Sequence, residues 1–78
     1  MELLRDRQEK LRKRLKEARL AAGLRQIDVA ASLRKPQSYI AKIERGERHV
    51  AFLEVLDLCD AVGLDPTTLV VELSRQSR

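Results

Sequence analysis

At 78 residues the chain is expected to form one small domain, and with one Phe, one Tyr and no Trp its core must be aliphatic, which favours packed helices. The single cysteine, Cys59, excludes an internal disulfide and a cysteine-based metal cluster, so we expect no cofactor and a cytoplasmic location. The net charge of +4 is uneven, because residues 1–48 carry fourteen Lys and Arg against seven acids whereas residues 49–78 carry two against five.

The first predicted helix covers residues 1–22 and is ended by Gly23. Its apolar side chains recur at spacings of three, four and seven, which places them on one side: Leu4, Leu11, Leu15, Ala18 and Ala22. Only the second half of this helix has a firmly apolar face. We therefore expect an N-terminal helical extension at residues 1–10, a compact domain at residues 11–73 and a frayed tail at residues 74–78.

Two short helices follow, joined by a tight turn. The first begins near Gln26 and turns Val29, Ala30 and Leu33 inward, and Pro36 limits its length because proline suits the first turn of the next helix. Helices this short and this closely joined must cross steeply, which the small Ala30 permits. This is the helix-turn-helix arrangement.

The third helix is expected between Pro36 and Gly46, and its two sides differ in character. The core side carries Pro36, Tyr39, Ile40 and Ile43. The other side carries Gln37, Ser38, Ala41, Lys42 and Arg45. Amide, hydroxyl and cationic donors around a small alanine suit a DNA major groove, although a polar outer face is common to surface helices in general.

A fourth helix is predicted at residues 52–62, and Asp65 with Pro66 predicts the start of a fifth, as its cap and first residue. The inward face of the fourth helix is expected to hold Phe52, Val55, Leu56, Cys59 and Val62. On this face Cys59 is interpreted as a core residue rather than a redox sensor. The last helix offers a buried or interfacial stripe of Leu69, Val70 and Leu73.

Several short motifs occur in a fixed order between Leu11 and Leu73. They are Leu15 with Arg19, Gly23-Leu24-Arg25-Gln26, Val29-Ala30, Ile40, Ile43-Glu44-Arg45-Gly46 and Leu64-Asp65-Pro66. In this order the chain resembles the lambda-repressor-like, Cro/C1-type (Xre family) helix-turn-helix proteins. The resemblance implies an all-α, compact five-helix lambda-repressor-like DNA-binding domain, here with an N-terminally extended first helix.

The resemblance also implies which residues touch DNA. Base reading falls to Gln37, Ser38 and Lys42, since an amide pairs with adenine N6 and N7 and an ammonium donates to guanine O6 or N7. Contacts to phosphates are implied for Gln26, Tyr39, Arg45 and Arg48. Apart from the resemblance, positive charge beside the same helix adds Arg25, Arg34 and Lys35 to the expected phosphate contacts. Arg19 and Glu44 match a buried salt bridge that in relatives ties the first helix to the third.

Two residues depart from the family pattern. Arg25 stands where Thr or Ser usually caps the second helix, a loss of about 1 kcal/mol. Arg34 replaces the glycine usual in the turn, where a left-handed backbone costs a residue with Cβ about 1 kcal/mol or more. Both add positive charge beside the third helix, so they either strengthen phosphate contact or reflect a relaxed requirement of the fold.

The sequence thus predicts a transcriptional regulator, a repressor that binds double-stranded DNA at an inverted repeat as a homodimer. The first choice of dimer surface is the stripe of Leu69, Val70 and Leu73. The second choice is the N-terminal extension around Leu3, Leu4 and Leu11.

The basic half also fits an acidic protein, so the competing function is a protein-binding module of the same fold, such as an antitoxin or an antiactivator that masks another regulator. No enzyme and no small-molecule substrate are expected, because no nucleophile, base and oxyanion site can be assembled from the residue pattern. No apolar run approaches the roughly 20 residues that span a bilayer, so no membrane partner is expected.

Overall fold

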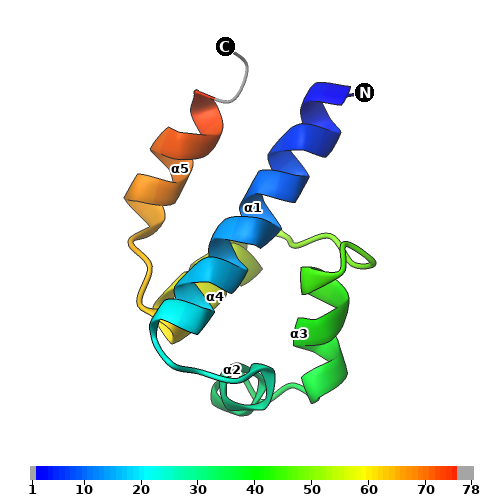
Figure 1. The fold of residues 1–78 in the computed structure, drawn as a ribbon, viewed down its shortest axis with the longest axis vertical. Coiled ribbons are helices and arrows are strands. Elements are labelled where there is room, and N and C mark those ends of the chain that lie inside the picture. Colours follow the sequence, from blue (N-terminus) through cyan, green and yellow to red (C-terminus); the bar gives the residue numbers. More distant parts are fainter. Residues whose placement is uncertain (1, 76–78) are drawn as a thin grey trace.

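The computed structural model describes residues 2–75 of the chain. In this range five helices form and no strand: α1 (Glu2–Ala21), α2 (Gln26–Ser32), α3 (Gln37–Glu44), α4 (Phe52–Val62) and α5 (Pro66–Ser74). Helix α1 crosses the molecule obliquely, with α5 on one side, α3 on the other, α2 across its lower end and α4 behind it (Figure 1). The predicted all-α, five-helix fold is confirmed.

One apolar core joins all five helices, and it is aliphatic as the composition requires. Its buried members are Leu15, Val29, Ala30, Ile40, Ile43, Leu58, Cys59, Val62 and Leu69. Cys59 and Leu69 are 0% and 1% exposed, so α4 and α5 both reach the centre. Burial raises the pKa of the Cys59 thiol, because the thiolate would lose its hydration there. This environment fits a small hydrophobic residue rather than a reactive thiol.

The inward face of α4 differs from the prediction. Phe52 is 68% exposed and Leu56 is also exposed, whereas Leu58 is buried. The buried stripe is marked by Val55, which packs against the core, and by Val62, one heptad later. Because each residue turns the helix by about 100°, Leu56 points well away from the stripe, and Phe52 lies at its edge in the first turn.

The start of α3 and its outer side also require correction. Pro36 is exposed and lies just before the helix rather than in it, since its ψ of 156° is extended while its carbonyl already accepts the Tyr39 N–H at 3.0 Å. Ala41, predicted on the outer side, is buried. Its methyl group is shorter than the polar side chains three and four residues away on the same helix, so it cannot meet a partner surface directly.

Helix α2 begins without a side-chain cap at Arg25, because a guanidinium has no acceptor to offer the free helix amides. Asp28 compensates by accepting the Arg25 backbone N–H at 2.8 Å. The Arg25 guanidinium also donates to both carboxylate oxygens, at 3.1 and 3.0 Å. These bonds lower the pKa of Asp28, the guanidinium contributing most. At α5, Asp65 accepts the Thr67 N–H at 2.9 Å ahead of Pro66, as predicted.

Four helices end in the same way, with an amide bonded to the carbonyl five residues back around a residue of positive φ. At α1, α3 and α4 that residue is Gly23, Gly46 or Gly63, with φ between 72° and 79°. At α2 it is Arg34, with φ of 58°, and Lys35 N–H reaches the Ala30 carbonyl at 2.9 Å. Within residues 2–75 Arg34 is the one residue with Cβ in this conformation, as the glycine replacement predicted.

Leu69→Ala should lower the free energy of unfolding by about 2–5 kcal/mol, because it empties a fully buried position in the core. The control is Thr68→Ala in the same helix, where the side chain is exposed and the change should stay within about 0.5 kcal/mol. Urea denaturation followed by circular dichroism measures both. Equal losses would mean that α5 is held through its outer face.

Arg34→Gly should raise the free energy of unfolding by up to about 1 kcal/mol, because relief of the left-handed backbone exceeds the extra freedom of glycine in the unfolded chain. Arg34→Ala removes the same charge but keeps the Cβ, so it should not stabilise. Urea denaturation of both variants and of the parent protein measures the free energy of unfolding. A gain shared by the two variants would point to charge repulsion instead of backbone strain.

Candidate nucleic-acid interface

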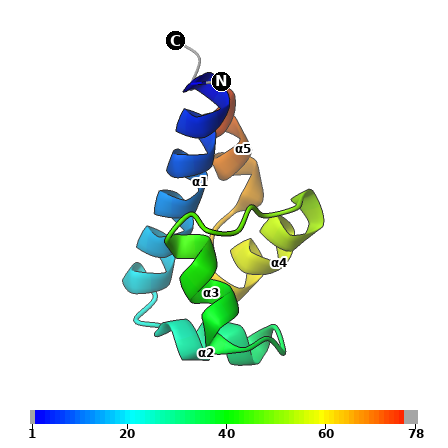
Figure 2. The ribbon, with the colours of Figure 1, turned by 90° about the vertical axis from the view of Figure 1, so that its right-hand side faces the viewer.

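Helix α3 presents an open face. In Figure 2 it stands in front of the other helices, with α2 below it and α1 rising past its upper end. Ile40 and Ile43 anchor the opposite side in the core. The three residues predicted to read bases, Gln37, Ser38 and Lys42, are all exposed on this helix.

A buried salt bridge holds α3 against α1. Arg19 Nε and Nη2 donate to the two carboxylate oxygens of Glu44 at 2.6 and 3.0 Å, and the side chains are 9% and 8% exposed. The remaining Arg19 Nη1 donates to the Leu24 carbonyl at 2.9 Å. The guanidinium therefore joins α1, the loop before α2 and the C-terminal end of α3, with each nitrogen hydrogen-bonded.

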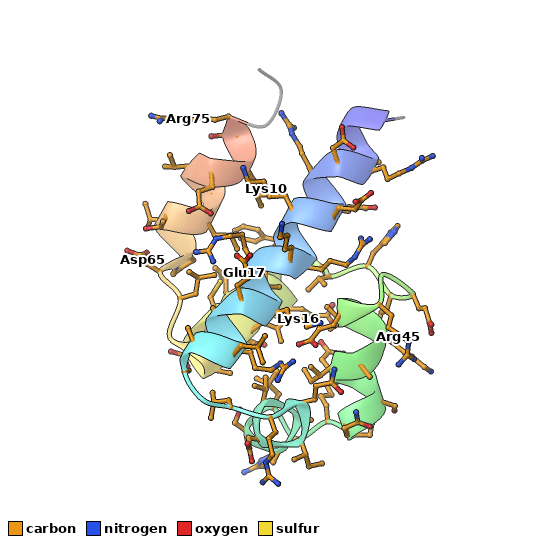
Figure 3. All side chains as sticks on the ribbon, viewed as in Figure 1. Lys10, Lys16, Glu17, Arg45, Asp65 and Arg75 are labelled. Carbon is orange, nitrogen blue, oxygen red and sulfur yellow. The ribbon has the colours of Figure 1, made fainter. Side chains whose placement is uncertain are left out.

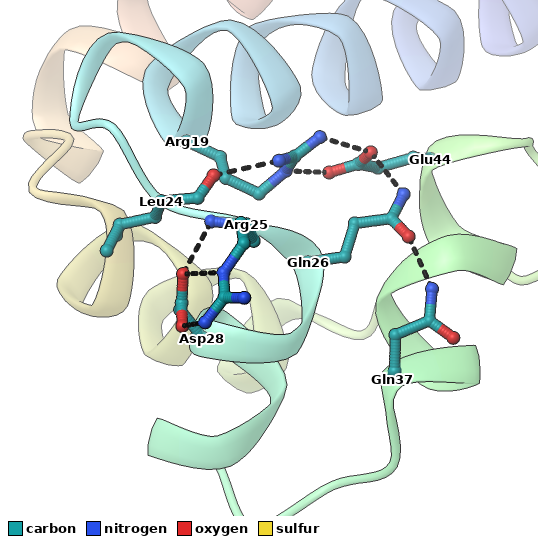
Figure 4. A network of polar contacts seen from close by, with 7 residues as sticks. All are labelled: Arg19, Leu24, Arg25, Gln26, Asp28, Gln37 and Glu44. Atoms are coloured by element: carbon teal, nitrogen blue, oxygen red, sulfur yellow. Dashed lines mark hydrogen bonds and ion pairs between the residues drawn. The ribbon is translucent and has the colours of Figure 1, made fainter.

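Two glutamines extend this network to the surface (Figure 4). Gln26 Nε2 donates to Glu44 Oε1 at 2.9 Å, and Gln37 Nε2 donates to Gln26 Oε1 at 2.6 Å. The order of donors and acceptors is forced from the inside, since a carboxylate that accepts from Arg19 can only accept from Gln26 as well. Gln26 must then turn its oxygen toward Gln37, which must turn its NH2 group inward.

This order determines what Gln37 offers outward. One of its two amide hydrogens is used on Gln26, which leaves the other hydrogen and the Oε1 acceptor side by side at the exposed start of α3. A donor and an acceptor in this arrangement match N7 and N6 of adenine. Gln26 keeps one N–H of its own, which is enough for a phosphate oxygen.

The seven side chains predicted to contact phosphates differ in whether they already bind a carboxylate of the protein. Arg25, Arg45 and Arg48 are each paired with a carboxylate. The Arg45–Glu47 pair is exposed, with bonds of 2.8 and 3.2 Å, and it holds the pKa of Glu47 below its usual range. Among the described side chains Arg34 and Lys35 have no such carboxylate, so their charge is available to DNA without breaking a pair.

Tyr39 joins two of these cations into a cluster. Lys35 Nζ lies 5.3 Å from the centre of its ring and Arg48 Cζ lies 4.8 Å from it, both within cation–π range. Arg48 also donates to Glu54 at 2.7 Å and to the His49 carbonyl at 3.1 Å. Burial, aided by the nearby Glu54 carboxylate, raises the pKa of the half-buried Tyr39. The cluster ties the loop after α3 to the start of α4.

Comparison with known proteins assigns this arrangement to a family. A family model of a helix-turn-helix domain matches residues 10–73. A solved structure described as an XRE-family like protein from Pseudomonas syringae pv. tomato str. DC3000 superimposes with a TM-score of 0.86 at 39% identity, over 92% of this chain and 88% of that one. The chain belongs to the Xre family of helix-turn-helix proteins.

Two further structures resemble this Xre-family chain. The restriction-modification controller protein C.AhdI from Aeromonas hydrophila gives a TM-score of 0.71 at 35% identity, over 80% of this chain and 94% of that one. The controller protein C.Esp1396I gives a TM-score of 0.78 over 90% and 92%, and its 21% identity supports the fold alone. No curated protein matches the sequence.

The predicted dimer surface is only partly exposed in this Xre-family fold. Leu69 belongs to the core and is not accessible to a partner. Leu73 is half-buried, so Val70 is the one residue of this stripe that is exposed. In the N-terminal extension Leu4 is exposed, Leu11 packs against the core, and Leu3 lies outside the residues whose side chains are described. The sequence pattern did not single out Leu53 of α4 and Val71 of α5, which are exposed, as are Phe52 and Leu56 of α4.

Neither a metal site nor a membrane span emerges from the part of the Xre-family chain that the structure describes. Across residues 2–75 the His, Cys, Asp and Glu side chains form no group of three that could hold a metal ion. None of the described helices is long and apolar enough to cross a membrane.

Proposed function

We propose that this chain is a sequence-specific DNA-binding transcription regulator, a repressor that binds an inverted-repeat operator in the cytoplasm as a homodimer. The observation that carries the proposal is the hydrogen-bond relay that runs from the buried Glu44 through Gln26 to Gln37. It presents one donor and one acceptor at the exposed start of a helix whose opposite side is anchored in the core. An amide held in this way loses little conformational freedom when it meets a base.

Each polar residue of α3 has a proposed role. Gln37 pairs with adenine through Oε1 and its free N–H. Lys42, one turn and a half further along α3, donates to guanine O6 or N7, and Ser38 accepts from or donates to a neighbouring base edge. Gln26 and the cations around the turn at Arg34 contact phosphates, which determine register and supply salt-dependent affinity.

We infer a homodimer because one recognition helix contacts too few base pairs to be specific. Helix α3 has eight residues and covers only a few base pairs, whereas two copies about 34 Å apart would enter successive major grooves. Apolar side chains exposed on α4 and α5 support pairing with a second copy: Phe52, Leu53, Leu56, Val70 and Val71. The similarity to C.AhdI, a restriction-modification controller protein, is consistent with a regulatory role.

The competing function is a protein-binding module of the same fold, an antitoxin or antiactivator. The exposed Phe52 and Leu53 are compatible with it, because exposed apolar side chains fit another regulator as well as a second copy. We infer no catalytic role, since the site's chemistry is that of hydrogen bonding and charge.

Selection of bound sequences from random duplex DNA tests the proposal directly. An inverted repeat with adenine at matched positions in both halves is the expected result, and its symmetry would also demonstrate the dimer. If no sequence is enriched at low salt while another protein co-purifies with the chain, the protein-binding module is the better description.

Gln37→Ala should relax the choice of base at one position of each half-site. The parent protein should lose about 1–3 kcal/mol of binding free energy when that adenine is replaced, and the variant should lose much less. Arg45→Ala is the comparison, because loss of a phosphate contact should weaken every sequence alike and reduce the slope of log K against log salt by about 0.9. Fluorescence anisotropy with the selected duplex and its single-base variants measures both. Equal discrimination by the parent and Gln37→Ala would remove Gln37 from the base-reading set.

A further inference from the structure

We propose that the edge of α1 facing α3 is an additional surface for the DNA backbone, formed by Arg5, Arg12 and Lys16 and separate from the helix-turn-helix contacts. This proposal rests on the proposed DNA binding and names a part of the chain that the base-reading site does not use. The partner is the sugar-phosphate backbone of the same duplex, recognised by charge rather than by sequence.

Helical spacing places the cations on one edge. Arg5, Arg12, Lys16 and Arg19 are separated by seven, four and three residues, which returns each side chain to nearly the same side of a helix. The direction of that edge is set by Arg19, which bonds Glu44 at the end of α3. The other three side chains continue the same edge toward the N-terminus.

Arg12 gives a second reference point. Its guanidinium lies over Gly46, the residue that ends α3, so closely that a Cβ at position 46 would be 2.8 Å from Arg12 Cζ. A cation at this place is favoured by the carbonyl end of α3 and is thereby held beside the open face of that helix. Arg12 and Lys16 have no carboxylate within ion-pair distance among the described side chains.

The opposite edge of α1 is organised differently. There Arg14 donates to Glu72 of α5 at 2.8 Å, so this charge serves helix packing. Figure 3 shows Lys10 on the α5 side of the helix and Lys16 on the α3 side. Arg14 therefore serves packing against α5, whereas Arg12 and Lys16 lie on the edge toward α3.

The length of this edge matches a stretch of the DNA backbone. From Arg5 to Lys16 the helix rises about 16 Å, a length over which one strand of B-DNA carries roughly five phosphates. Figures 1 and 2 both show this half of α1 rising past the C-terminal end of α3. Glu9 is an exposed carboxylate near this edge, between Arg5 and Lys16 in the chain, and it should repel the same phosphates.

The salt dependence of binding tests the proposal with the duplex recovered by selection. If Arg12 and Lys16 each release one counterion, the double variant Arg12→Ala with Lys16→Ala should reduce the slope of log K against log salt by about 1.8. Between 50 and 200 mM salt the parent protein should then lose roughly tenfold more affinity than the variant. Lys10→Ala is the matched control, because it removes one charge from the same helix on the other edge and should leave the slope unchanged.

Glu9→Gln separates charge from folding, because it removes a repulsive carboxylate from an exposed position. It should tighten binding several-fold at low salt, a gain that misfolding cannot produce. Ethylation of single phosphates should reveal positions that weaken the parent protein and have no effect on the double variant. Circular dichroism confirms that each variant is folded.

The possible failures are distinguishable. If the parent protein binds DNA and the double variant keeps its slope and its ethylation pattern, the α1 edge is not a DNA surface. If the variant instead changes only self-association, an acidic face of a second copy is the partner and the proposal is overturned. If the parent protein binds no duplex at all, the proposed DNA-binding function fails together with this inference.

Discussion

Burial of one guanidinium against one carboxylate organises both the fold and the candidate site. Arg19 reaches from α1 to Glu44 at the end of α3 and to the Leu24 carbonyl, so three segments are tied at one point. A buried pair adds little net stability, but loss of either partner would leave an unpaired charge in the interior. The same carboxylate forces the donor order of Gln26 and hence of Gln37, so the base-reading amide is oriented by a residue that never meets DNA.

The helix ends show how far a family pattern can be altered without loss of the fold. The C-terminal end of α2 has the same backbone as those of α1, α3 and α4, although Arg34 replaces glycine there. The start of α2 lacks a side-chain cap at Arg25, and Asp28 restores part of the bonding from inside the helix. Both departures place an arginine beside the proposed DNA surface. Arg25 is held by an ion pair, whereas Arg34 retains its backbone strain and has no carboxylate partner among the described residues.

The net charge does not show which cations are available to bind DNA, because that depends on whether each cation is already paired with a carboxylate. Several arginines are occupied by neighbouring acids: Arg14 with Glu72, Arg45 with Glu47 and Arg48 with Glu54. The pairs at Arg45 and Arg48 stabilise the loop after α3, and DNA would have to compete with their carboxylates. Other cations have no such pair among the described side chains: Arg12 and Lys16 on the α1 edge, Arg34 and Lys35 in the turn between α2 and α3, and Lys42 on α3.

The sequence by itself determined the five helices, the residues that end them and the family, because glycine, proline and capping residues act locally and helical spacing marks the inner positions of α2 and of the middle of α1. It also predicted the left-handed backbone at Arg34. It did not determine the ends of the α1 face, where Leu4 and Ala22 are exposed, or the outer side of α3, where Ala41 is buried. Only the tertiary structure decided which side of each helix the neighbours cover. Leu69 became core and Phe52 surface because burial depends on where α1 and α5 cross α4, and no spacing within one helix contains that information. The relay from Glu44 to Gln37 likewise joins three helices through contacts between residues far apart in the chain.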